Sequence, residues 1–133
     1  GEAGNAEDVK TAVHMGAVRI GHGVRIAGNK EVIQLVKDKG VFLEMCPTSN
    51  RQTKAMEEMS AYPLKTFLEM GLKVTLNTDD PAIERTTLSR EFRYMESLLD
   101  LTQEQKRLLL LNSVEAAFTS RNRKWKLKEQ LLF

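Results

Sequence analysis

The sequence predicts an α/β fold built on a parallel sheet, and two patterns support this prediction. Short apolar runs typical of strands alternate along the chain with longer segments of helical periodicity. Strands that are separated by helices pair in parallel through right-handed crossovers. A polar cluster also follows each strand, so the clusters recur at about the length of one βα unit.

The first helix and strand lie near the N-terminal end of the sequence. Glu7 and Asp8 stand where the helix dipole favours acidic side chains, and Gly16 marks the expected end of the helix. Residues 17–20 then form a short strand of Ala, Val, Arg and Ile. The sequence Gly-His-Gly at residues 21–23 ends this strand.

The next two helices and strands follow the same plan. Residues 31–39 keep helical spacing and end at Gly40, the residue type preferred after a helix. The strand predicted next covers residues 41–45. Residues 63–70 form a helix with Pro in its first turn, and residues 73–76 form the third strand.

The remaining segments are one irregular region and a helical C-terminal part. Residues 46–50, Cys-Pro-Thr-Ser-Asn, stop the second strand, and the polar, Met-rich residues 51–62 predict a long loop or an irregular helix. Thr102 with Gln105 matches a capping box, and Ser113 matches one less well. The helices predicted from Thr86 onward are about 88–99, 102–111, 113–119 and 122–132.

Composition excludes several classes of protein. The chain has 133 residues, 41% of them apolar, which suits one domain and is too short for a large barrel or two domains. A net charge of +2 gives no reason to expect nucleic acid or an anionic membrane as partner. No segment predicts a membrane span or a signal peptide. The single Cys allows no intrachain disulfide and favours a reducing compartment, so we expect a cytoplasmic protein.

The polar clusters are expected to lie together in space. The carboxyl ends of parallel strands meet at one edge of the sheet, which is where ligands bind in such folds. His22, residues 46–50 and Asp79 with Asp80 each follow a predicted strand. Glu2 would join them if a strand preceded Gly1, although taken by itself it is an ordinary surface Glu.

Each candidate also has a purely structural interpretation. His22, between two glycines, could be a metal ligand, a general base or a turn residue. Asp79 and Asp80 could meet a metal and a second partner, or they could cap a helix that begins at Pro81. Thr48, Ser49 and Asn50 could bind a ligand or shape a turn.

Other chemically distinctive residues have structural explanations that we prefer. Cys46 is expected to be a buried, inert thiol, and His14 a surface or packing residue. Glu44 lies within an apolar strand and either faces the interior with a partner or reaches the rim. Residues 121–128 interleave basic side chains with Trp125, a pattern that suits nucleic acid but also an ordinary last helix with solvated charges.

Three segments resemble the last three strand-end motifs of the adenosine deaminase family, in order and in separation. They are residues 19–23 (Arg-Ile-Gly-His-Gly), 45–50 (Met-Cys-Pro-Thr-Ser-Asn) and 76–81 (Leu-Asn-Thr-Asp-Asp-Pro). Gly1-Glu2 resembles the end of that family's His-Ala-Gly-Glu motif. The related AMP deaminases share the Thr-Asp-Asp-Pro core but differ around it, and adenine deaminases of the same family are closer alternatives.

The resemblance implies a more specific fold than the residue pattern does. The family fold is a TIM (β/α)8 barrel with one divalent metal, usually zinc, at the carboxyl end of the strands. Residues 1–133 are therefore expected to form the C-terminal portion of one such domain. This portion would be a partial barrel of about three to four βα units that ends in a helical segment.

The resemblance also implies a reaction and the residues that perform it. Adenosine and 2′-deoxyadenosine would be converted to inosine products and ammonia by attack of a zinc-bound hydroxide on purine C6. Asp79 would be a metal ligand, and His22 would accept the proton of the metal-bound water and orient the hydroxide. Glu2 would protonate purine N1. Asp80 would hydrogen-bond N7, and Gly1 would help to bind the substrate.

The sequence departs from the family at the metal site. The family uses three histidines besides the aspartate, and neither His14 nor His22 occupies one of those positions. We therefore expect a C-terminal fragment that begins inside a catalytic motif and is inactive alone. A second hypothesis is a non-catalytic module that pairs its open sheet edges with the missing N-terminal half of the barrel or with another copy. An unrelated phosphate-binding half-barrel fits less well, since no Lys follows the glycines around His22.

Overall fold

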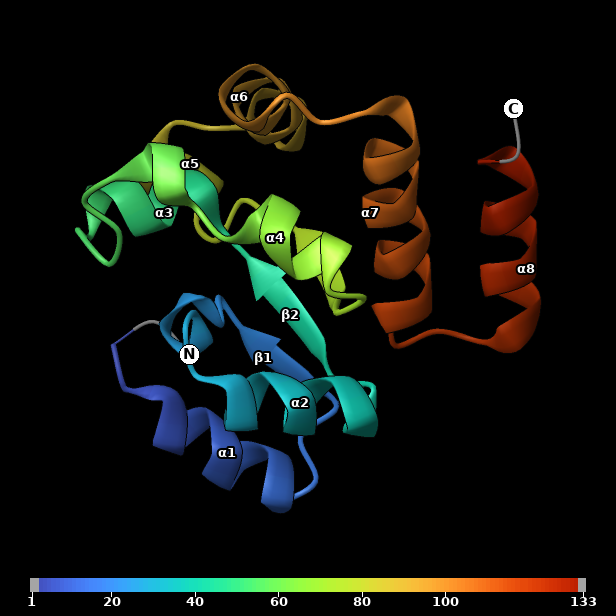
Figure 1. Cartoon of the computed structure of the whole chain (residues 1–133). Coiled ribbons are helices and arrows are strands. Elements are labelled where there is room, and N and C mark those ends of the chain that lie inside the picture. The colour runs from blue at the N-terminus through green and yellow to red at the C-terminus, as the bar shows by residue number, and fades with distance from the viewer. Residues whose placement is uncertain (1–2, 132–133) are drawn as a thin grey trace.

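A computed structural model describes residues 3–131. It shows one parallel sheet whose strands are separated in the sequence by helices (Figure 1). The strands are β1 (Arg19–Gly21), β2 (Phe42–Met45) and β3 (Lys73–Leu76), in the order β1-β2-β3. The α-helices are α1 (Ala6–His14), α2 (Lys30–Lys39), α3 (Pro47–Gln52), α4 (Leu64–Glu69), α5 (Pro81–Glu84), α6 (Leu88–Leu99), α7 (Gln103–Ala116) and α8 (Arg121–Gln130). Two short 3₁₀ helices, η1 (Val24–Ile26) and η2 (Met59–Ala61), complete the described elements.

The register of the sheet brings the ends of the three strands to one edge. Ile20 pairs with Leu43, which pairs in turn with Val74. The backbone pairing continues one residue past two strands, because His22 N donates to Glu44 O at 2.8 Å and Asn77 N donates to Met45 O at 2.9 Å. The predicted α/β class with a parallel sheet is therefore confirmed.

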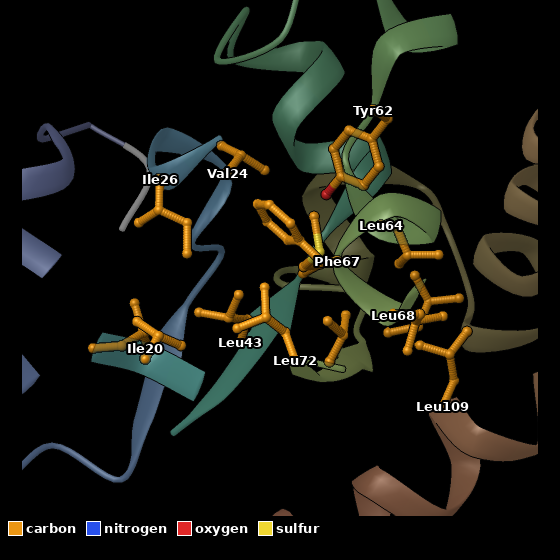
Figure 2. Close-up of a cluster of buried hydrophobic side chains, with 14 of the residues drawn as sticks. Ile20, Val24, Ile26, Leu43, Tyr62, Leu64, Phe67, Leu68, Leu72 and Leu109 are labelled. Carbon is orange, nitrogen blue, oxygen red and sulfur yellow. The ribbon is translucent and has the colours of Figure 1, made fainter. Parts of the chain in front are cut away.

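The hydrophobic core lies between the sheet and the helices packed against it. Figure 2 shows a hydrophobic cluster that includes Leu43 of β2 and side chains from η1, α4 and α7. Leu43 and Leu109 are fully buried, and Phe67 is nearly so. Helix α7 is also attached to the sheet by a polar contact, because Nδ2 of buried Asn112 donates to Val74 O at 2.8 Å.

Helix boundaries follow the local sequence at several points. Asn5 caps α1, and its side-chain oxygen accepts from Glu7 N and Asp8 N while Asp8 accepts from Asn5 N, which makes a capping box. Gly40 ends α2 with a φ of 64°. The predicted capping box of Thr102 and Gln105 begins α7. Each of these ends was predicted within a few residues.

Two sequence predictions about helices are wrong. Residues 47–50 do not merely stop β2, because Pro47 occupies the first turn of helix α3. Residues 102–119 hold one long helix, α7, in place of two. Ser113 lies inside α7 and donates its hydroxyl to Leu109 O at 2.9 Å, so it caps nothing.

Helix α8 stands beside α7 at the edge of the molecule (Figure 1). The predicted helix is present, but none of its described residues is buried and Trp125 is 57% exposed. The helix is thus an ordinary one in its solvated charges, but Trp125 does not pack into the core. Among the helices of residues 3–131, none is long and apolar enough to cross a membrane.

Candidate active site

The three strand-end clusters that the sequence singled out meet at the carboxyl edge of the sheet. His22 follows β1, Ser49 and Asn50 lie in α3 after β2, and Asp79 follows β3. Their side chains are linked to one another by contacts of 2.8 to 3.5 Å. An open cleft of about 470 Å³ lies here, lined by Gly21, His22, Glu44, Cys46, Leu76, Asn77, Thr78, Asp79, Leu88 and Ser113.

His22 is held in an uncommon backbone conformation at the end of β1. Its φ is 63°, a left-handed value that few non-glycine residues adopt. Gly23 follows with φ of 78°, and a Cβ there would lie 2.8 Å from a side-chain carbon of Leu43. The glycine therefore lets the turn pack closely on β2 while the His22 side chain reaches the cleft.

The imidazole of His22 has a polar neighbour at each ring nitrogen. Nδ1 lies 2.9 Å from Nδ2 of Asn50, and Nε2 lies 3.5 Å from Oδ2 of Asp79. The His22 side chain is only 16% exposed. Because both nitrogens face fixed groups, the ring is oriented before any ligand arrives.

Asp79 also adopts a left-handed backbone conformation, with φ of 60°. Ser49 donates its hydroxyl to Oδ2 of Asp79 at 2.8 Å, and the Asp79 side chain is 42% exposed. The carboxylate is thus oriented by α3 and by His22 while part of it stays accessible from the cleft. Such a carboxylate is a suitable ligand for a divalent metal.

Asp80 has a structural task in addition to its position beside Asp79. Its Oδ1 accepts from Ala82 N and Ile83 N, both at 3.2 Å, and so caps α5, with Pro81 in the first turn. The capping interpretation of Asp80 is therefore confirmed. Its predicted contact with purine N7 stays a prediction.

Buried Glu91 connects the helices around the site through hydrogen bonds, and it was not predicted from the sequence. Its carboxylate accepts from Thr48 N at 3.1 Å and from the Thr86 hydroxyl at 2.5 Å, and the residue has no exposed surface. It thereby joins α6 to the first turn of α3 and to the segment after α5. The available signal was an acidic residue four positions before Met95, on the same buried face of α6.

Glu84, at the end of α5, is a second buried acid that the sequence analysis missed. Its Oε2 is buried without a hydrogen-bond partner among the described residues. Burial raises the pKa of the Glu84 carboxyl above its ordinary value of 4.5, and the negative charge of nearby Asp79 adds to this effect, although the nearby Ser49 hydroxyl opposes it. The folded chain therefore binds the Glu84 proton more tightly than the unfolded chain does.

Cys46, Glu44 and His14 have the structural roles that the sequence analysis considered for them. Burial first, and then the charge of nearby Asp79 and other carboxylates, raises the pKa of the Cys46 thiol to about 12, so it is inert at neutral pH. Glu44 is half-buried and pairs with Arg19 Nε at 3.3 Å. His14 is exposed in the last turn of α1.

The described residues do not form a complete metal site. Within residues 3–131, no group of three or more His, Cys, Asp or Glu side chains could hold a metal ion. Asp79 is the one predicted metal ligand in this part of the chain. Gly1 and Glu2, predicted to take part in substrate binding and catalysis, lie outside the described residues.

The comparisons with known proteins agree with this geometry. The model of the adenosine deaminase family matches residues 1–132. The chain belongs to the adenosine deaminase family. An adenosine deaminase from Clostridium botulinum is 45% identical over 129 residues, which are 96% of this chain and 38% of that protein. The chain spans about two-fifths of the length of the curated family members that it matches.

Solved structures agree on the fold. An adenine deaminase from Arthrobacter aurescens is 30% identical, with a TM-score of 0.93 over 98% of this chain and 40% of that chain. An amidohydrolase from Burkholderia ambifaria, solved with bound Zn, is 23% identical, with a TM-score of 0.85 over 96% of this chain and 36% of that chain. At 23% identity, the second comparison supports only the fold. In both comparisons this chain matches a minor part of a larger structure.

Proposed function

We propose that this chain is the C-terminal part of the barrel of an adenosine deaminase, which hydrolyses adenosine and 2′-deoxyadenosine to inosine products and ammonia. The observation that carries the proposal is the convergence of His22, Ser49, Asn50 and Asp79 at the carboxyl edge of the sheet. These residues come from the three motifs that resemble the family. The partial barrel would be completed by an N-terminal part like that of its longer relatives, and we call the two parts together the complete enzyme.

The roles proposed for the individual residues are those that the family resemblance implies, and the positions of His22 and Asp79 in the cleft support two of them. Asp79 would bind zinc together with histidines of the N-terminal part, since residues 3–131 supply too few ligands. When bound, zinc lowers the pKa of water from 15.7 to about 7. His22 would hydrogen-bond the attacking water beside Asp79. Asp80 and Gly1 would bind the purine, and Glu2 would protonate N1, which makes C6 more electrophilic.

Adenine is the competing substrate, because the adenine deaminase from Arthrobacter aurescens shares the fold so closely. Adenosine is favoured because the sequence identity to proteins named adenosine deaminase is higher, at 45% against 30%. AMP is a third alternative that we consider weaker.

The test is ammonia release by the complete enzyme from adenosine, 2′-deoxyadenosine, adenine and AMP. We expect kcat/KM to be highest for the two nucleosides. A preference for adenine or AMP would replace the proposed substrate while keeping the family. The absence of activity on all four, in a protein that binds zinc, would contradict the proposed reaction.

Two further proposals concern the surroundings of the chain. The open edges of β1 and β3 would be covered by the N-terminal part of the barrel or, in its absence, by another copy of this chain. We also propose that the protein is cytoplasmic. The one Cys, which is buried and free, suits a reducing compartment.

A further inference from the structure

Tyr62 reaches the candidate active site from outside the three motifs. It lies between η2 and α4, its exposed fraction is 2%, and its ring stands at one end of the hydrophobic cluster (Figure 2). Its hydroxyl donates to Oδ1 of Asn50 at 2.7 Å. Asn50 has no exposed surface, so this hydrogen bond is shielded from water.

The hydrogen bond from Tyr62 decides which way the Asn50 amide points. An amide oxygen can only accept and an amide nitrogen can only donate. Because Oδ1 of Asn50 accepts from Tyr62, Nδ2 is the atom that faces His22, at 2.9 Å from Nδ1. Nδ1 of His22 must therefore be an acceptor. In a neutral imidazole the proton then lies on Nε2.

The opposite side of the ring independently favours the same arrangement. Nε2 of His22 lies 3.5 Å from Oδ2 of Asp79, and that oxygen also accepts the Ser49 hydroxyl. A proton on Nε2 faces the carboxylate favourably. An unprotonated Nε2 would place its lone pair against a negative oxygen, which is repulsive.

We propose that Tyr62 and Asn50 are positioning residues that hold His22 in the tautomer with its proton on Nε2. The consequence for the reaction rests on the proposed function. In that tautomer Nε2 offers an N–H to the oxygen of the attacking water and orients it beside Asp79. This differs from what the family resemblance implies, namely that His22 accepts the proton of the metal-bound water.

The first test is ¹⁵N NMR of the His22 ring in the 133-residue chain at about pH 8.5, well above the pKa of about 6.5 of an unperturbed imidazole. We expect one tautomer, with the proton on Nε2. Asn50→Asp should move the proton to Nδ1, because a carboxylate can accept from both Tyr62 and His22. A wild-type ring with its proton on Nδ1 would overturn the proposal without any variant.

Tyr62→Phe removes only the hydroxyl and leaves the ring that packs in the core. We expect its two His22 ring shifts to move toward each other as the tautomers mix, whereas Tyr94→Phe on α6 should leave them unchanged. Tyr94 is the matched control because its ring packs under the guanidinium of Arg51, 5.3 Å from the centroid, and none of the described contacts within residues 3–131 links it to His22. Unchanged shifts in Tyr62→Phe would contradict the role of Tyr62.

The second test is kinetic and uses the complete enzyme with adenosine. Tyr62→Phe should lower kcat about threefold to tenfold with little change in KM, the loss expected for one neutral hydrogen bond. Asn50→Asp should lower kcat at least as much, and Tyr94→Phe should leave it unchanged. A normal kcat in Tyr62→Phe would refute the positioning role. If adenosine proves not to be the substrate, the tautomer measurement still decides the structural claim.

Discussion

His22 and Asp79 share an uncommon backbone conformation at the edge of the sheet. Each directly follows a strand end or its turn, and each has a left-handed φ, of 63° and 60°. Such conformations are costly for residues with a Cβ and are concentrated at functional sites. Here the left-handed backbone brings the imidazole within 3.5 Å of the carboxylate. The strain is thus coupled to the geometry on which the proposed function depends.

Asp79→Ala in the complete enzyme should remove zinc and activity together. Without the carboxylate the metal would lose one of its protein ligands, and both Ser49 and His22 would lose an acceptor. Zinc content by atomic absorption and kcat on adenosine measure the two effects. Asp38→Ala is the control, since Asp38 is exposed on α2 and bonds only Gln34 in the described contacts. An unchanged zinc content would refute the role of Asp79 as a ligand.

Glu84→Gln should make the 133-residue chain more stable at neutral pH. The raised pKa of Glu84 means that the folded chain keeps a proton that the unfolded chain releases as pH rises above about 4.5. The wild type therefore loses stability as pH rises through this range, and the Gln variant does not. Urea unfolding at about pH 4 and about pH 7 should show equal stability at the lower pH and a more stable variant at the higher one.

Glu58 is the control for this prediction, because its pKa is shifted in the opposite direction. Hydrogen bonds from Ser60 lower the pKa of the exposed carboxyl of Glu58. The stabilising contribution of the Glu58 carboxylate to folding is therefore present above its ordinary pKa and is lost as pH falls. Glu58→Gln should not stabilise the chain at neutral pH. A Glu84 variant that is less stable than the wild type at pH 7 would contradict the raised pKa of Glu84.

At the scale of elements, Glu91 connects helices that carry different parts of the site. It belongs to α6, but its carboxylate bonds the backbone of Thr48 in α3 and the hydroxyl of Thr86 after α5. The same helix, α3, carries Ser49 and Asn50. This buried carboxylate thus helps to fix the position of α3 relative to Asp79 and His22. We regard Glu91 as a residue that stabilises the site without lining the cleft.

Glu91→Ala should lower the free energy of unfolding by about 3 kcal/mol, because it removes a buried carboxylate that accepts from Thr48 N and from the Thr86 hydroxyl. Urea denaturation of the 133-residue chain measures this. Glu96→Ala is the matched control on the same helix. Glu96 pairs with Lys106 and is 45% exposed, so its removal should cost less than about 1 kcal/mol. Equal effects of the two substitutions would contradict the structural role of Glu91.

The elements that the sequence predicted well are those with a local cause. The strand at residues 73–76 and the helix at 88–99 match β3 and α6, because apolar periodicity and flanking turn residues define both. Helix α3 was missed because Pro47 was taken only as a breaker. The split of α7 came from reading Ser113 as a cap, although its hydroxyl bonds within the helix.

The candidate site was predictable only in part. Topology alone placed His22, Ser49, Asn50 and Asp79 at one edge, because parallel strands bring their carboxyl ends together. The sequence could not reveal that Tyr62, Glu84 and Glu91 reach the same region. These residues lie outside the three motifs, and they come near the site only through the packing of α4, α5 and α6 on the rest of the molecule.

At the scale of the whole molecule, the sheet is incomplete by the standard of its family. β1 and β3 each pair with one strand among the described residues, and relatives are more than twice as long. Large apolar side chains such as Met15, Ile83 and Phe118 are more than 70% exposed. Unpaired strand edges and exposed apolar surface favour association with another chain. This supports the proposal that the molecule works as one part of a barrel.

The 133-residue chain alone should therefore be inactive and should associate. One carboxylate cannot hold zinc tightly, so no ammonia should be released from adenosine above the level of an Asp79→Ala control. Light scattering of a dilute sample should give a mass above the 15.1 kDa of the monomer. Addition of a separately expressed N-terminal part should restore a 1:1 complex with activity. Deamination by the chain alone, with complete enzyme excluded by mass spectrometry, would overturn the proposed division of the site, and a strictly monomeric chain that ignores the N-terminal part would overturn the proposed association.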